Sequence, residues 1–150
     1  MADCMKFEDY LDKYGTLTYS NVGRSMLPLI RQGKDLFIIT KKGSSRFGRG
    51  DVVLYRSPSG RYVLHRIIKV RRSDYVILGD NCVNKEYGIR DKDILGVMTG
   101  FVRGGKEHST DERGYRLYTA VILKTTPVRV VLKKAAMRLK RAVKKLLKRI

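Results

Sequence analysis

The chain contains few cysteines, few acidic residues and no long hydrophobic run. Only two of its 150 residues are cysteines, Cys4 and Cys82. Two cysteines form one bridge at most, so the disulfide framework of a small secreted domain is excluded. We expect both residues to be free thiols in a reducing compartment, and the sequence assigns neither of them a role.

The hydrophobic runs are too short to cross a membrane. Such runs, for example at residues 119–123 and 130–132, fall far below the roughly 20 residues that a spanning helix needs. The first 14 residues are charged and lack an apolar centre, so they do not resemble a secretory signal. We therefore expect no transmembrane helix and no signal peptide.

Acidic residues are outnumbered, and the imbalance is concentrated at one end. The chain has 33 Lys and Arg against 14 Asp and Glu, a net charge of +19. Ten of these cations and no acid lie in residues 127–150, and the rest of the chain has 23 basic residues against 14 acidic ones. The charge therefore belongs largely to one segment, and is not spread evenly as on a nucleic-acid-binding surface.

The rest of the pattern predicts one β-rich domain. Strands are expected where short β-forming runs end at Gly or Pro turns, at residues 16–22, 35–40, 52–55, 62–70, 75–78 and 94–102. Residues 6–14 have apolar positions at helical spacing and end at Gly15, which predicts a short helix. We predict a β-rich domain at 1–103 including this helix, a linker at 104–114 and a helical tail at 115–150.

The tail reads as a basic amphipathic helix. Thr125, Thr126 and Pro127 are typical of a helix start, with a capping residue before a proline in the first turn. One face then carries Val128, Leu132, Ala135, Leu139, Ala142, Val143, Leu146 and Ile150. Lys and Arg fill the other face, so we expect residues 127–150 to bind an anionic membrane surface. Nucleic acid is the rival partner, but the segment has no aromatic residue on which bases could stack.

A serine is placed where its hydroxyl can face solvent. Ser25 stands two residues after Gly23 and three before Pro28, where the first strand is expected to end. Glycine allows backbone angles closed to other residues, and proline fixes its own φ. By itself such a serine is usually an ordinary turn residue.

One of only two histidines, His65, lies within a strongly β-forming run. Its ordinary pKa near neutrality suits a base that takes the proton of a serine hydroxyl. Such a base needs a partner on its other ring nitrogen, and Asp80 and Glu86 are the carboxylates on offer. A lone histidine in a strand is more often structural, so only the combination with Ser25 is informative.

Several short motifs together resemble the type I signal peptidase family. In chain order they are Ser25-Met26-x-Pro28, Gly50-Asp51-Val52-Val53, His65-Arg66, Gly79-Asp80-Asn81 and Ile94-Leu95-Gly96. The match spans residues 21–102, about half of the chain. The resemblance implies a mainly β fold, the coiled and barrel-like sheet that signal peptidases share with LexA-type repressors. To it this chain adds the short N-terminal helix and the long basic C-terminal helix.

The resemblance also implies roles for individual residues. Ser25 matches the nucleophile, and His65, standing just before Arg66, matches the base of the Ser-His branch. Asp80 is expected to orient His65, with Glu86 as the competing carboxylate. No metal or cofactor is expected in this chemistry.

The oxyanion and substrate contacts are expected around the nucleophile, at Gly23, Arg24 and Met26. Many members of the family have a serine where this chain has Gly23, so the oxyanion would depend on the backbone N–H of Ser25. Cys82 is a weaker alternative nucleophile.

The resulting hypothesis is a serine endopeptidase that cleaves an extended signal- or leader-like peptide at a membrane surface. We expect a peripheral location on the cytoplasmic face. A LexA-like self-cleaving regulator is one alternative, although only about twenty residues precede Ser25, too few for a helix-turn-helix module, and no Ala-Gly dipeptide occurs. A non-catalytic module that binds membrane or nucleic acid is the other alternative.

Overall fold

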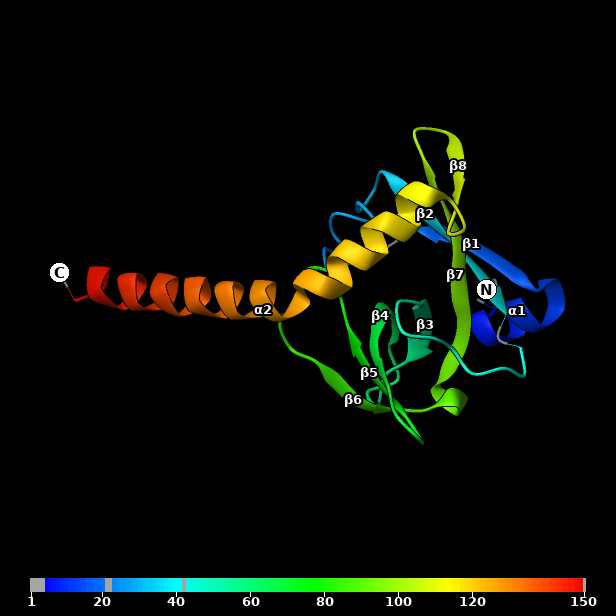
Figure 1. Ribbon diagram of the computed structural model, residues 1–150, viewed down its shortest axis with the longest axis horizontal. Coiled ribbons are helices and arrows are strands. Elements are labelled where there is room, and N and C mark those ends of the chain that lie inside the picture. The colour runs from blue at the N-terminus through cyan, green and yellow to red at the C-terminus, as the bar shows by residue number, and fades with distance from the viewer. Residues whose placement is uncertain (1–4, 21–22, 42, 150) are drawn as a thin grey trace.

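The protein is one antiparallel sheet with a long helix lying against it (Figure 1). The computed structural model describes residues 5–20, 23–41 and 43–149. Its elements are, in chain order, α1 (Phe7–Tyr14), β1 (Thr16–Ser20), β2 (Asp35–Lys41), β3 (Val52–Arg56), β4 (Tyr62–Val70), β5 (Tyr75–Leu78), β6 (Glu86–Ile89), the 3₁₀ turn η1 (Asp91–Asp93), β7 (Ile94–Arg103), β8 (Lys106–Ser109) and α2 (Arg113–Leu147). The expected strands and first helix are confirmed, with most ends within a residue of their predicted limits. Residues 21 and 22 of the first expected strand, and Cys4, lie outside the described residues.

The strands form one sheet in the order β1-β2-β7-β3-β4-β5-β6, with β8 beside β7. Every pairing is antiparallel. β7 pairs with β2 along one edge and, along the other, first with β3 and then with β8. The outermost strands β1 and β6 do not pair with each other in the described chain, so the sheet is open and not a closed barrel.

Apolar side chains pack on both faces of the sheet. In β3, Val52 and Leu54 join a cluster that also holds Leu11 of α1, whereas Val53 and Tyr55 join a second cluster. Successive residues of a strand point to opposite faces, so both faces of β3 are covered. This explains the unbroken run Val-Val-Leu-Tyr, since a strand covered on both faces does not alternate polar and apolar residues.

Helix α2 starts earlier than the sequence predicts. It begins at Arg113 and continues through Pro127, so the predicted helix start at Thr125, Thr126 and Pro127 is wrong. The two threonine hydroxyls donate instead to carbonyls in the preceding turn of the same helix, over 2.7 Å and 2.6 Å. Residues 104–114, expected to be a linker, contain β8 and the first residues of α2.

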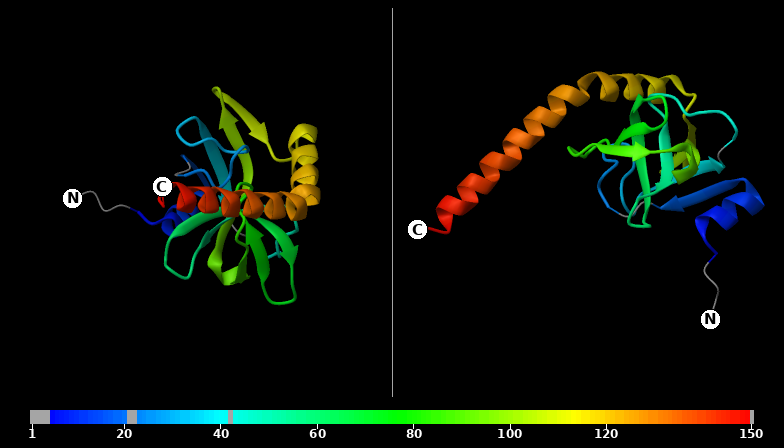
Figure 2. Two further views of the ribbon diagram at one scale, coloured as in Figure 1. Left: turned by 90° about the vertical axis from the view of Figure 1, so that its left-hand side faces the viewer. Right: turned by 90° about the horizontal axis from the view of Figure 1, so that it is seen from below.

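Pro127 divides α2 into two parts with different surroundings. Proline has no N–H for the carbonyl of the preceding turn, and helices commonly bend there. Figures 1 and 2 show the bend, with the first part of α2 against the domain and the second part projecting away from it. We name two segments of α2 by their burial and not by the position of the proline. Residues 113–133, which include all the buried positions of the helix, are the inner segment, and residues 134–147, all of them exposed, are the outer segment. Among the described residues, no helix is both long and apolar enough to cross a membrane.

Candidate active site

Ser25 lies in the turn that follows β1. Gly23 has φ +104°, a backbone conformation that residues other than glycine rarely adopt, and a Cβ there would meet nothing within 4 Å. A serine at this position is therefore disfavoured by the backbone conformation and not by a lack of space. Ser25 itself is partly exposed, whereas Met26 is fully buried in the core cluster. The expectation that Met26 contacts substrate is wrong for its side chain, because that side chain fills the core.

His65 lies in the middle of β4 and is only 8% exposed. Its Nδ1 lies 3.1 Å from Oε1 of Glu86, at the start of β6. The hydroxyl of Tyr55, on β3, donates to Oε2 of Glu86 over 2.7 Å and lies 3.3 Å from the same Nδ1. An ionised carboxylate only accepts hydrogen bonds, so the proton of the neutral imidazole belongs on Nδ1. Nε2 is then left with a lone pair, as a general base requires.

Ser25 and His65 meet at Gly79. A Cβ on Gly79 would lie 2.7 Å from the carbonyl oxygen of Ser25 and 2.9 Å from Cδ2 of His65. Both groups therefore lie against the same point of the chain, and only glycine leaves room for them. The backbone of Ser25 and the ring of His65 are therefore neighbours across Gly79. The two side chains and Glu86 line one cleft of about 550 Å³.

Asp80 does not contact His65 in this structure. Arg66, whose side chain is fully buried, donates to Asp80 from Nε and from Nη2, each over 2.8 Å. The hydroxyl of Tyr118, on α2, donates to the same carboxylate over 2.8 Å. With these donors in place Asp80 forms a buried ion pair, and Glu86 is the carboxylate that contacts the imidazole. The expected orienting role of Asp80 is therefore corrected in favour of the competitor.

Glu86 and not Asp80 contacts His65 for a geometric reason. His65 and Arg66 are neighbours in β4, so their side chains point to opposite faces of the sheet. Asp80 lies on the Arg66 side, where α2 covers it, and Glu86 lies on the His65 side. The sequence placed both carboxylates near His65 but did not show which face each would reach.

The inner segment of α2 holds the loop that touches Ser25. Arg129 donates to the carbonyl of Asp80 over 2.7 Å, and Lys133 donates to the carbonyl of Asn81 over 2.7 Å. The backbone N–H of Asn81 donates in turn to the carbonyl of Ser25 over 2.8 Å, and its side chain donates to Arg24 over 3.0 Å. Two cations of the tail therefore hold the loop that lies beside Ser25.

Several of these contributors were missed by the sequence reasoning. Tyr55 carried no signal beyond that of a strand residue, Gly79 was noted only as part of the Gly79-Asp80-Asn81 motif, and Arg129 was counted only as a charge of the tail. Arg66 was noted only as the neighbour of His65. Their roles depend on contacts between distant segments, which a local pattern does not report.

Cys82 is a poor candidate for the nucleophile. Its Sγ donates a long contact of 3.9 Å to the carbonyl of Ser25. Burial raises the pKa of its thiol, and this leaves little thiolate at neutral pH. Ser25 therefore stays the better-supported nucleophile.

Burial also sets the protonation of His65. It disfavours the charged imidazolium and lowers the pKa of His65 below its ordinary value of 6.5, although the charge and hydrogen bond of Glu86 act in the opposite direction. The imidazole is thus neutral at pH 7 and can accept a proton. Within the described part of the chain, no group of three or more His, Cys, Asp or Glu side chains is placed to hold a metal ion.

No family model matches the chain, and no curated protein or solved structure is significantly similar to it.

Proposed function

We propose that the protein is a serine endopeptidase in which Ser25 is the nucleophile, His65 the base and Glu86 the orienting carboxylate. The observation that carries this proposal is that the Ser25 backbone and the His65 ring adjoin the same glycine and that both residues line one cleft, with a carboxylate on Nδ1 of the imidazole. Nucleophile, base and orienting group in this relation are the usual composition of a serine hydrolase site. The resemblance to signal peptidases and LexA-type repressors points to the same residues, and we propose that the sheet belongs to that fold family.

The reaction begins when the Ser25 hydroxyl attacks the peptide carbonyl and its proton passes to Nε2 of His65. Glu86 stabilises the imidazolium that results, and His65 then protonates the leaving amine. In the second half His65 takes a proton from water as the water oxygen attacks the acyl carbonyl, and His65 then returns that proton to Ser25 Oγ as the acid product leaves. Among the described residues, no hydrogen bond uses the backbone N–H of Ser25, so this donor is available to the oxyanion.

The clefts around His65 suit an extended peptide. The cleft that contains Ser25 is bordered by the β3–β4 hairpin. A second cleft of about 590 Å³ shares His65 and Glu86 with it and runs on between Cys82 and α2, where Met137 and Lys140 line it. A peptide lying through both would pass directly over the imidazole. A signal- or leader-like segment in extended form is the substrate we propose.

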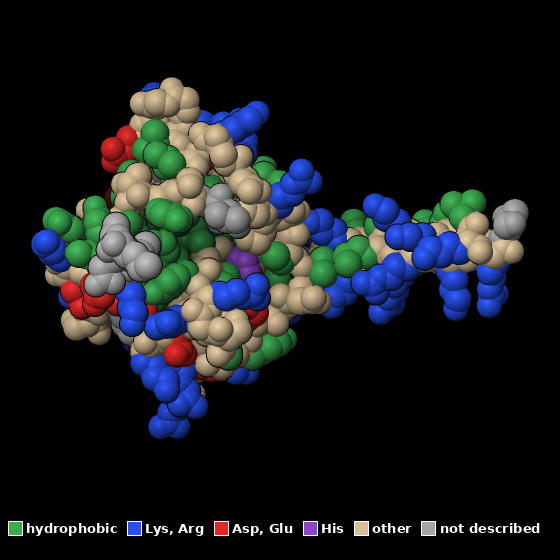
Figure 3. All heavy atoms as spheres, turned by 180° about the vertical axis from the view of Figure 1, so that it is seen from behind, with side chains coloured by type: hydrophobic (Ala, Val, Ile, Leu, Met, Phe, Trp, Pro, Cys, Tyr) green, Lys and Arg blue, Asp and Glu red, His purple; other side chains and the backbone are tan. Residues whose placement is uncertain are grey.

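We also propose that α2 carries the enzyme to an anionic membrane surface, on the cytoplasmic side. Apolar side chains of its outer segment are open to solvent, among them Leu139 at 67% and Leu146 at 62% exposed. Figure 3 shows Lys and Arg side chains along the projecting part of the helix, with hydrophobic side chains between them. A helix with one apolar and one cationic face is stabilised in a headgroup layer, where its apolar side chains leave water and its cations lie beside anionic headgroups.

The test is cleavage of a signal- or leader-like peptide by the purified full-length chain, followed by mass spectrometry. Ser25→Ala is expected to abolish cleavage, while Ser59→Ala, a hydroxyl that lines the same cleft, is expected to leave it unchanged. Equal cleavage by the Ser25→Ala variant would refute the proposal. Cleavage of the chain itself in place of the added peptide would favour the LexA-like alternative.

A further inference from the structure

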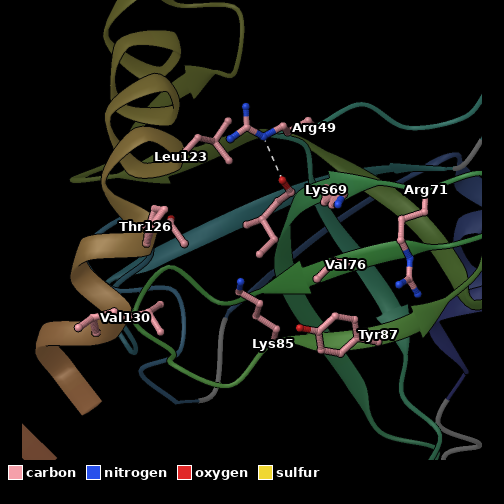
Figure 4. Close-up of a pocket in the computed structure, with 12 residues that line it drawn as sticks. Arg49, Lys69, Arg71, Val76, Lys85, Tyr87, Leu123, Thr126 and Val130 are labelled. Atoms are coloured by element: carbon pink, nitrogen blue, oxygen red, sulfur yellow. Dashed lines mark hydrogen bonds between the residues drawn. The ribbon is translucent and has the colours of Figure 1, made fainter. Parts of the chain in front are cut away.

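A cavity separate from the Ser25 cleft lies between α2 and the edge of the sheet formed by β4, β5 and β6. Its volume is about 510 Å³, within the range of small-molecule sites in proteins. Figure 4 shows Leu123, Thr126 and Val130 on α2 at one side, facing Lys69 and Lys85 at the other. Neither Ser25 nor His65 lines it, so the proposed chemistry does not explain its composition.

The rim of the cavity is positively charged and has no carboxylate. Four cations line it, Arg49, Lys69, Arg71 and Lys85. Asp74 pairs with Arg71, and Arg49 donates to the carbonyl of Ile68 over 3.0 Å. Lys69 and Lys85 form no ion pair or side-chain hydrogen bond with any described residue. Two uncompensated ammonium groups beside a pocket attract an anion.

The lining of the cavity on the helix side is apolar. Leu123, Pro127, Val130 and Val131 all come from α2 around its bend. An inorganic anion alone would leave these side chains without a partner, whereas the first carbons of an acyl chain would cover them. The ligand that matches both halves of the cavity is an anion joined to an apolar chain.

The cavity also continues into the exposed apolar face of α2. Val131 lines the cavity and is 67% exposed, and Val128 and Leu132 beside it are 62% and 63% exposed. These side chains lead from the cavity to the apolar residues of the outer segment. A molecule held in the cavity can therefore stay part of the lipid layer on which the helix lies.

We propose that this cavity binds an anionic phospholipid, with its phosphate between Lys69 and Lys85 and the start of an acyl chain against Val130 and Val131. The site goes beyond the proposed peptidase activity, because none of its residues takes part in the catalysis. It adds a binding site for an individual lipid molecule to the general attraction of a cationic helix for an anionic membrane surface. The test must distinguish this phospholipid from two other anions, an acidic peptide and free phosphate.

The experiment titrates the full-length chain with short-chain phosphatidylglycerol below its critical micelle concentration, by calorimetry or by NMR shifts. Monomeric lipid reports on the cavity and not on the surface charge of a vesicle. Phosphatidylcholine of the same chain length, inorganic phosphate and an acidic peptide are titrated in parallel. We expect phosphatidylglycerol to bind at least ten-fold more tightly than each of the other three.

The variant Lys69→Gln/Lys85→Gln is expected to weaken phosphatidylglycerol binding by roughly 25-fold, from about five-fold for each lysine. Lys34→Gln/Lys106→Gln removes the same charge from exposed sites that do not line the cavity and should bind as the parent does. Val131→Glu changes an exposed side chain, so it should fold normally and also weaken binding. Parent-like binding by the first variant, or phosphate or peptide binding as tight as the lipid, would overturn the proposal.

Discussion

The two histidines of the chain form almost the same contact in two different places. His65 and Glu86 lie 3.1 Å apart, Nδ1 to Oε1, and His108 and Glu112 lie 3.1 Å apart, Nδ1 to Oε2. The first pair joins residues from two strands, whereas the second joins residues four apart in the chain, between β8 and α2. The contact by itself therefore does not distinguish a candidate active site from a surface ion pair.

The surroundings make the difference. The side chain of His65 is 10% exposed, and a cleft that also contains Ser25 opens beside it. The side chain of His108 is 27% exposed, and its ring stacks on Phe101 with centroids 5.1 Å apart. Burial and the neighbouring hydroxyl distinguish the pair that we propose for proton transfer from the pair at the surface, and the following experiments test this difference.

The largest expected effect comes from Glu86→Gln. The amide would donate to Nδ1 and favour the tautomer with its proton on Nε2, leaving no lone pair on Nε2 to accept the Ser25 proton. We expect kcat/KM for peptide cleavage to fall by about 10³–10⁴-fold. The matched variant Glu112→Gln changes the same kind of pair at His108 and should leave kcat/KM unchanged. Equal losses in the two variants would remove the distinction between the pairs.

The second effect concerns Asp80, the carboxylate that pairs with Arg66 and does not contact His65. Asp80→Ala leaves the fully buried Arg66 without its ion-pair partner. We expect the free energy of unfolding, measured with urea, to fall by about 3–5 kcal/mol. Asp12→Ala breaks an exposed pair with Lys41 and should cost about 1 kcal/mol or less. A folded Asp80→Ala variant of normal stability that has lost activity would return the orienting role to Asp80.

The third effect concerns Tyr55, whose hydroxyl contacts the His65–Glu86 pair and not the His108–Glu112 pair. Tyr55→Phe removes the hydroxyl that donates to Glu86 over 2.7 Å, and we expect kcat to fall by about ten-fold. Tyr75 donates in the same way to Asp91 over 2.7 Å and lines neither of the two clefts beside the imidazole. Tyr75→Phe is therefore the control and should keep its kcat. If both variants kept full kcat, Tyr55 would have no part in positioning the pair.

The smallest effect is on the pH profile. Burial lowers the pKa of His65, so the base is already neutral below pH 6.5 and loses activity only as the pH falls further. The acid limb of kcat/KM should therefore have its midpoint below 6.5, at the pH where NMR shows the His65 ring to titrate. Glu86 opposes this shift, so Glu86→Gln should move the titration to still lower pH. A midpoint above 6.5 would contradict the environment described for His65.

The sequence predicted a large part of the fold because the strands carry their own signals. The alternating or continuous apolar runs predicted β2, β3, β4, β5 and β7 within about a residue, and Gly15 ended α1 where expected. β6 was not among the predicted strands, because Glu86, Tyr87 and Gly88 show no β-forming run. The start of α2 was placed 12 or more residues too late, since Thr125, Thr126 and Pro127 carry strong local signals for a helix start. Packing of Ile122 and Val130 against the domain outweighed those signals.

The candidate site was predictable for Ser25 and His65, because glycine and proline mark the turn and a histidine is rare in this chain. It was not predictable for the orienting carboxylate. Glu86 reaches His65 only because β5 pairs with both β4 and β6, and this brings residues 21 positions apart in sequence into contact. Met26 follows Ser25 directly in sequence, but the direction of its side chain placed it in the core.

The sequence by itself determined the strands, the cationic amphipathic tail and the two residues proposed for proton transfer, because each of these depends on residue type and short spacing. Only the tertiary structure decided which carboxylate meets which base, and that the tail also supports the loop beside Ser25. Those outcomes depend on strand register and on the face toward which each side chain points. A shift of one residue reverses the face, and no local pattern records it.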